Sequence, residues 1–169
     1  MKGNQILVTD NPRGRQIEGI IAGTPKPGTV VQIVRGTAAD GNGRHTWEPY
    51  GTTAASGNEG VAADGDKRVI AVLLEDLEQG KTYNDAYVTG TRCFLYFPAM
   101  GEELNMLVEN QTGTGSNDDY GVGDLLQVDD GTGKLIQTDS NAESEPFQIL
   151  EAAADVAADA HYWVMYTGH

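Results

Sequence analysis

The sequence is poor in the residues that carry most enzyme chemistry. It has one cysteine, Cys93, so an intrachain disulfide is excluded, and only three histidines, His45, His161 and His169. It has no His-x-x-x-His spacing and no cysteine–histidine cluster, the patterns typical of zinc sites. Cys93 lies in the apolar run Arg92–Phe97 without a base nearby in sequence, which predicts a buried, unreactive thiol. We therefore expect no enzyme, with no catalytic, cofactor-binding or metal-binding residues.

Basic residues are also few. The chain has 11 Lys and Arg against 25 Asp and Glu, a formal net charge of -14. Proteins that bind nucleic acid present clustered Lys and Arg to phosphate, and anionic membranes attract the same residues. We therefore expect neither nucleic acid nor a membrane as a partner. The surplus carboxylates either keep the surface soluble or complement a basic partner surface, and both readings stay open.

Long apolar runs are missing as well. The longest, Val69–Leu74, is too short to span a bilayer. The start, Met1–Gln5, lacks the apolar core of a secretory signal. These two features predict a protein that is made and used in a reducing cytoplasm, or in something assembled there.

Short apolar runs separated by glycine fill most of the chain, which has 22 glycines. This pattern predicts an all-β fold, a compact antiparallel barrel or sandwich with long loops. The predicted strands are residues 16–22, 29–35, 45–48, 68–75, 92–97, 104–109, 125–128, 134–137, 147–151 and 161–166. An Asp130-Gly131 step between two of them is a strong hairpin signal. No repeat of fixed period is found, which disfavours a solenoid or propeller.

The chain divides by composition into an arm and one domain. Residues 1–15 are expected to form an extended N-terminal arm, and residues 16–169 a single β domain with a long irregular loop region at about 36–67. Two predicted strands, 92–97 and 161–166, carry apolar residues on both faces. Either a covering loop or a neighbouring subunit explains such strands.

Two ligand sites can be considered from the loops. The stretch Gly131–Lys134 superficially resembles a phosphate loop, but Leu135 stands where such a loop needs Ser or Thr, so a hairpin is favoured. Asp64-Gly65-Asp66 and Asp118-Asp119 offer oxygen ligands for calcium, yet neither matches a complete calcium loop. Turn chemistry is the favoured reading of both acidic stretches.

Two other functions depend on where particular side chains lie. An exposed Trp47 and Tyr50 would form a platform for sugar, as in a carbohydrate- or receptor-binding β module of a fibre or surface protein. A hydrolase or lyase would need a pocket that brings His45 or His161 together with carboxylates. A buried Trp47 or scattered histidines would argue against these two alternatives.

The order of segments in the second two thirds of the chain resembles a known kind of protein. The segments that carry the resemblance are Gly60–Asp66, Val69–Asp76, Ala86–Gly90, Met100–Glu102, Gly121–Leu126 and Asp130–Leu135. Over residues 60–169 the chain resembles the small β-barrel decoration (cement) proteins of tailed-bacteriophage heads. The resemblance implies a structural protein of the virion, made in the host cytoplasm. It would bind the outer capsid surface, stabilise contacts between major capsid subunits and assemble with itself, often as trimers.

Overall fold

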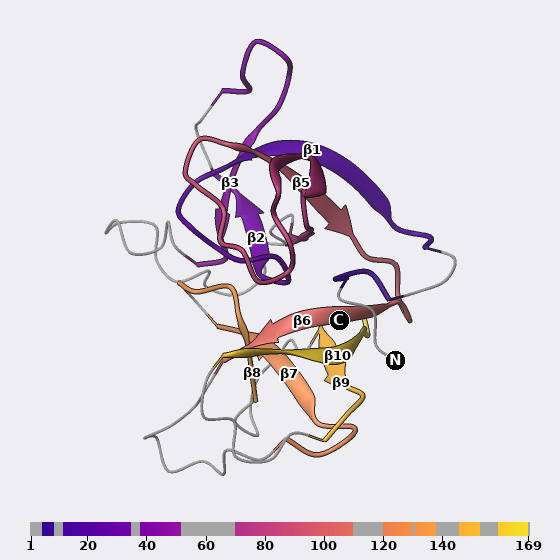
Figure 1. Ribbon diagram of the computed structural model, residues 1–169. Coiled ribbons are helices and arrows are strands. Elements are labelled where there is room, and N and C mark those ends of the chain that lie inside the picture. The colour runs from indigo at the N-terminus through magenta and orange to yellow at the C-terminus, as the bar shows by residue number, and fades with distance from the viewer. Residues whose placement is uncertain are drawn as a thin grey trace.

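The chain folds into two small β-barrels that pack against each other (Figure 1). The computed structural model describes residues 5–8, 12–34, 38–51, 70–109, 120–129, 131–137, 146–152 and 159–168. The first barrel contains β1 (Arg15–Ile21), β2 (Val30–Ile33), β3 (Thr46–Pro49), β4 (Ile70–Leu73) and β5 (Arg92–Phe97). The second contains β6 (Glu103–Val108), β7 (Leu125–Val128), β8 (Leu135–Gln137), β9 (Phe147–Ile149) and β10 (Ala160–Tyr166). The all-β prediction is confirmed, and each predicted strand overlaps one observed strand.

The two barrels have the same strand order. The first closes in the order β1-β3-β2-β4-β5, and the second in the order β6-β8-β7-β9-β10. Each contains one parallel pair, β1 with β3 and β6 with β8, and its other pairs are antiparallel. The hairpin prediction is confirmed by the antiparallel pairing of β7 with β8, and Asp130 itself lies outside the described residues. Each strand of the first barrel therefore has its counterpart five strands later in the chain, at the same place in the second barrel.

Individual backbone hydrogen bonds repeat between the barrels too. The matching pairs are Gly28 N to Leu73 O with Gly123 N to Ile149 O, Leu74 N to Phe94 O with Leu150 N to Trp163 O, and Ala22 N to Trp47 O with Glu109 N to Leu135 O. The sequence Gly28–Ile33 (GTVVQI) corresponds to Gly123–Val128 (GDLLQV), and both glycines have a positive φ. The chain is therefore an internal duplication of one five-stranded unit. Connections of different length in the two halves hide it from a search for a fixed period.

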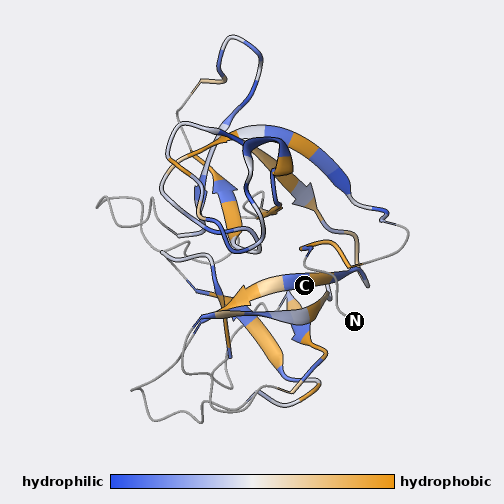
Figure 2. Ribbon diagram, viewed as in Figure 1, coloured by the Kyte–Doolittle hydropathy of each residue, from blue (hydrophilic) through white to orange (hydrophobic). Residues whose placement is uncertain are grey.

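The core explains why β5, one of the two strands predicted to have two apolar faces, is apolar on both sides. Cys93 and Leu95 of β5 are fully buried inside the first barrel. Tyr96 belongs to the larger core that the second barrel shares with β2 and β4, and Phe94 packs against it. The second face of β5 is thus covered by the chain's own second barrel. The alternation of apolar and polar residues along the outermost strand, β1, is visible in Figure 2.

The N-terminal segment, residues 5–8 and 12–14, is extended but lies against the second barrel. Ile6 is fully buried in the shared core, and Leu7 forms an antiparallel bridge with Leu104 of β6. The described part of the expected arm is thus bound within its own chain. Within the expected loop region at 36–67, residues 46–49 form β3, and residues 52–67 lie outside the described residues.

Candidate functional site

Backbone hydrogen bonds cross the contact between the two barrels, here called the barrel junction. Leu107 N donates to Gly28 O at 3.1 Å, and Val30 N donates to Gly133 O at 2.8 Å. Gly131 N donates to the carbonyl of Tyr50 at 2.8 Å. These bonds join β6 and the β7–β8 hairpin of the second barrel to β2 and to residues that flank β2 and β3 in the first. Together with the shared apolar core, they hold the two barrels as one body.

Gly133 allows the closest approach at the barrel junction. Its φ is +68°, in the left-handed region that L side chains rarely adopt. A Cβ added to Gly133 would overlap the carbonyl oxygen of Val30 and lie 3.0 Å from the backbone nitrogen of Tyr50. Only glycine therefore lets the hairpin reach the first barrel.

The outer edge of β6 binds the N-terminal segment. Asn105 N donates to Ile6 O at 2.7 Å, and Val8 N donates to Glu103 O at 3.2 Å. Ile6 N donates to the Glu75 carboxylate of the first barrel at 2.6 Å. The segment acts as a short additional strand that contacts both barrels. It covers backbone groups that would otherwise form an open sheet edge.

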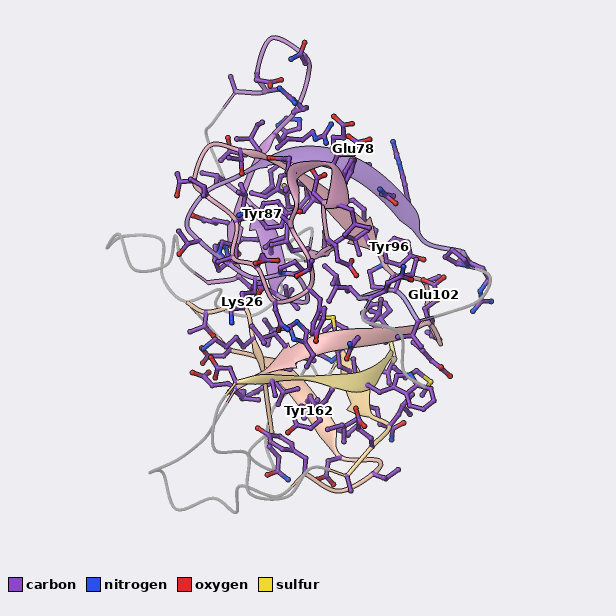
Figure 3. All side chains as sticks on the ribbon, viewed as in Figure 1. Lys26, Glu78, Tyr87, Tyr96, Glu102 and Tyr162 are labelled. Atoms are coloured by element: carbon purple, nitrogen blue, oxygen red, sulfur yellow. The ribbon has the colours of Figure 1, made fainter. Side chains whose placement is uncertain are left out.

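Glu102 fixes the second part of the N-terminal segment. Its buried carboxylate accepts hydrogen bonds from Gly14 N at 3.1 Å, Tyr96 Oη at 2.7 Å and Ala99 N at 2.6 Å, and it also accepts one from Arg13 N. Figure 3 shows Tyr96 and Glu102 side by side, where the first barrel meets the turn into β6. One carboxylate therefore joins the N-terminal segment, β5 and the β5–β6 turn.

Electrostatics favour the charged form of Glu102. Burial by itself raises the pKa of this carboxyl group, but the backbone donors of Arg13 and Ala99 and the Tyr96 hydroxyl outweigh it, so the pKa lies below its ordinary value. For Tyr96, burial and the hydrogen bond to Glu102 raise the pKa to about 12. Near neutral pH the pair is thus an ionised carboxylate that accepts a hydrogen bond from a neutral phenol.

A second buried carboxylate, Asp76, is also used structurally. It caps the short 3-10 helix Leu77–Gln79 by accepting from Gln79 N at 3.2 Å. Arg92 lies 3.1 Å from it and also pairs with the exposed Glu78 at 2.7 Å. Burial by itself raises the pKa of Asp76. The hydrogen bonds from Gln79 and Arg92 lower this pKa by more, so it lies below its ordinary value. This cluster therefore connects the 3-10 helix to β5 through Arg92.

Cys93 is buried as predicted. It is 0% exposed, and burial raises the pKa of its thiol to about 12. We expect a thiol reagent at about pH 8, where a free cysteine is partly ionised, to leave the native protein unmodified. Unfolding in denaturant is expected to expose Cys93 to stoichiometric modification. Rapid modification of the native protein would contradict this account of the first barrel.

The sugar platform is not available in this fold. Trp47 is 2% exposed inside the first barrel, where its ring packs edge-on against Phe97 with centroids 5.8 Å apart. Tyr50 is partly buried and packs against the shared core. The buried position of Trp47 therefore argues against the sugar-binding alternative, which required this side chain to be exposed.

The histidines are scattered. His45 is exposed and directly precedes β3. His161 is on β10, where its Nε2 donates to Pro27 O at 2.7 Å and its ring contacts Tyr83. Burial lowers the pKa of His161, against the opposing effect of that hydrogen bond. His169 lies outside the described residues. The structure does not bring the two described histidines together.

Several sequence candidates lie outside the described residues. These are Asp64-Gly65-Asp66 and Asp118-Asp119. Among the residues that are described, no group of three or more His, Cys, Asp or Glu side chains is placed to hold a metal ion. The described part of the chain also contains no helix long and apolar enough to cross a membrane. Gly131–Lys134 belongs to the β7–β8 connection, which agrees with the hairpin prediction.

Comparison with known proteins adds no relative. No protein-family model matches the chain, and no curated protein matches it. The buried polar groups Glu102 and Asp76 went unnoticed in the sequence because a carboxylate among 25 has no local mark of burial. The described structure is a pair of barrels packed against each other, in which buried carboxylates hold backbone segments in place.

Proposed function

We propose that the chain is a structural protein of a virus head, which binds the outer capsid surface and stabilises contacts between major capsid subunits. The observation that carries this proposal is the duplicated, locked pair of barrels. A body made of two equivalent units, held together by backbone bonds and a shared core, suits a clamp across repeated neighbouring subunits. The net charge of -14 favours a basic partner surface.

The resemblance of residues 60–169 to phage-head decoration proteins supports the same proposal. So does the use of Glu102 and Asp76, which bind backbone and neighbouring side chains of their own chain. In this proposal the outer surfaces of the barrels bind the capsid. The buried carboxylates hold the segments that form these surfaces in fixed positions.

Binding to capsids tests the proposal directly. Purified protein is added to expanded capsids from the source of the chain, and bound copies are counted after sedimentation. Binding is expected to saturate at a number set by capsid symmetry, to raise the temperature at which capsids break, and to weaken as salt screens the charges. The absence of binding to any such capsid would remove the proposal.

A further inference from the structure

The duplication makes it possible to compare the same strand edge in the two barrels. Glu18 of β1 pairs with Phe94, and Asn105 of β6 pairs with Trp163. Because Phe94 and Trp163 accept matching hydrogen bonds from Leu74 and Leu150, Glu18 is the counterpart of Asn105. By the same register, Gln16 is the counterpart of Glu103. The edge that binds the N-terminal segment on β6 therefore has its equivalent at Gln16–Glu18.

The backbone groups of Gln16 and Glu18 point away from β5. Ile21 N donates to Thr91 O on the β5 side, whereas Ile20 N and Ala22 N donate to β3 on the other side. The backbone N–H and C=O groups of successive residues point to opposite edges of a strand. Those of Gln16 and Glu18 therefore point to the same edge as those of Ile20, the β3 side. However, β3 pairs with β1 only at Ile20 and Ile21.

This stretch, the open edge of β1, has no strand beside it in the described part of the chain. Both Gln16 and Glu18 are exposed, and β1 runs along the outer rim of the first barrel (Figure 1). On β6, the equivalent groups are occupied by Ile6 and Val8. Among the described residues, the two halves thus differ at this edge: the N-terminal segment pairs with the β6 edge, whereas no described segment pairs with the β1 edge.

We propose that the open edge of β1 pairs antiparallel with the same edge of a second copy of this chain. A two-fold axis at Ile17 would place Gln16 opposite Glu18 of the second copy, and the reverse. Four backbone hydrogen bonds would form, and each Gln amide would donate to a Glu carboxylate across the pair. Arg15 would lie opposite Gly19, which has no side chain to obstruct it. The edge is therefore complementary to itself, as a two-fold contact requires.

The pairing opposes a net repulsion. Each copy carries -14, so association is expected to strengthen as salt rises and screens this charge. This salt dependence is opposite to the one expected for capsid binding. The proposed pairing goes beyond the capsid proposal, because two copies of the chain would associate with or without a capsid. It also predicts a dimer in place of the trimer that the resemblance implies.

Light scattering on the full-length chain tests the pairing. The mass is expected to rise from 18.0 kDa toward twice that value as protein approaches about 1 mM in about 0.5 M salt. Gln16→Pro, which removes an edge N–H at an exposed position, is expected to keep the chain monomeric. A monomer under all these conditions, a trimer, or a dimer unaffected by Gln16→Pro would overturn the proposal.

Charge substitutions at Gln16 test the register. Gln16→Lys would face Glu18 of the second copy and is expected to tighten the dimer about fivefold, whereas Gln16→Glu is expected to weaken it about fivefold. Asn84→Lys and Asn84→Glu make the same change in net charge at an exposed position away from the edge. If the substitutions at Asn84 act as strongly as those at Gln16, net charge alone explains the effect and the register is wrong.

Discussion

Replacement of Gly133 by alanine is expected to lower the free energy of unfolding by about 4 kcal/mol, near the upper end for single substitutions. The added Cβ would overlap Val30 O and crowd Tyr50 N, and φ at this position is +68°. The hairpin between β7 and β8 would have to withdraw from the first barrel. The loss is measured by chemical denaturation monitored by circular dichroism.

Gly131 is the matched control for this prediction. It lies in the same hairpin with a φ of +101°, but an added Cβ there meets no atom within 4 Å. Gly131→Ala should therefore cost only the conformational strain, about 1 kcal/mol. Equal losses for Gly131→Ala and Gly133→Ala would show that close contact at the barrel junction does not matter. A loss confined to Gly133→Ala would locate the coupling of the barrels there.

Replacement of Glu102 by alanine is expected to lower the free energy of unfolding by about 3 kcal/mol, because buried donors would lose their acceptor. The orphaned groups are the backbone N–H groups of Arg13, Gly14 and Ala99 and the hydroxyl of Tyr96. Proteolysis is then expected to remove the N-terminal segment before the barrels are cut. Glu78→Gln, at an exposed side chain, is the control and should cost well under 1 kcal/mol.

The pH dependence of Glu102→Gln separates charge from shape. The pKa of Glu102 in the folded chain lies below its ordinary value of 4.5, so the carboxylate stabilises the fold above that value. This stabilisation is lost as the pH falls through the folded-state pKa. The difference in stability between the native chain and Glu102→Gln is therefore expected to be largest near neutral pH and to shrink in acid. A difference that stays constant with pH would show that the charge plays no part.

A large share of the local structure could be predicted from the sequence. The runs at 92–97 and 125–128 coincide with β5 and β7, because alternating or compact apolar residues between glycine turns leave few other conformations. The Asp130-Gly131 step predicted the β7–β8 hairpin for a similarly local reason. The burial of Cys93 was also predictable, since it lies within an apolar run.

The candidate site could not be predicted in the same way. Glu102 follows a glycine turn and is followed by another glutamate, so its sequence surroundings look like those of an exposed loop. Only the return of residues 13–14 beside Tyr96 surrounds it with donors. For Trp47, the sequence left both an exposed and a buried position open, and closure of the first barrel places it inside.

By itself, the sequence determined the acidic charge, the all-β class and the approximate position of every strand, because charge is a sum and strand formation depends on nearby residues. The tertiary structure decided how the strands close into two equivalent barrels, and which strand edge the described N-terminal segment covers. It also decided which of 25 carboxyl groups become buried anchors. These features depend on contacts between residues far apart in the chain, such as Ile6 with Asn105 and Val30 with Gly133, and no local pattern records them.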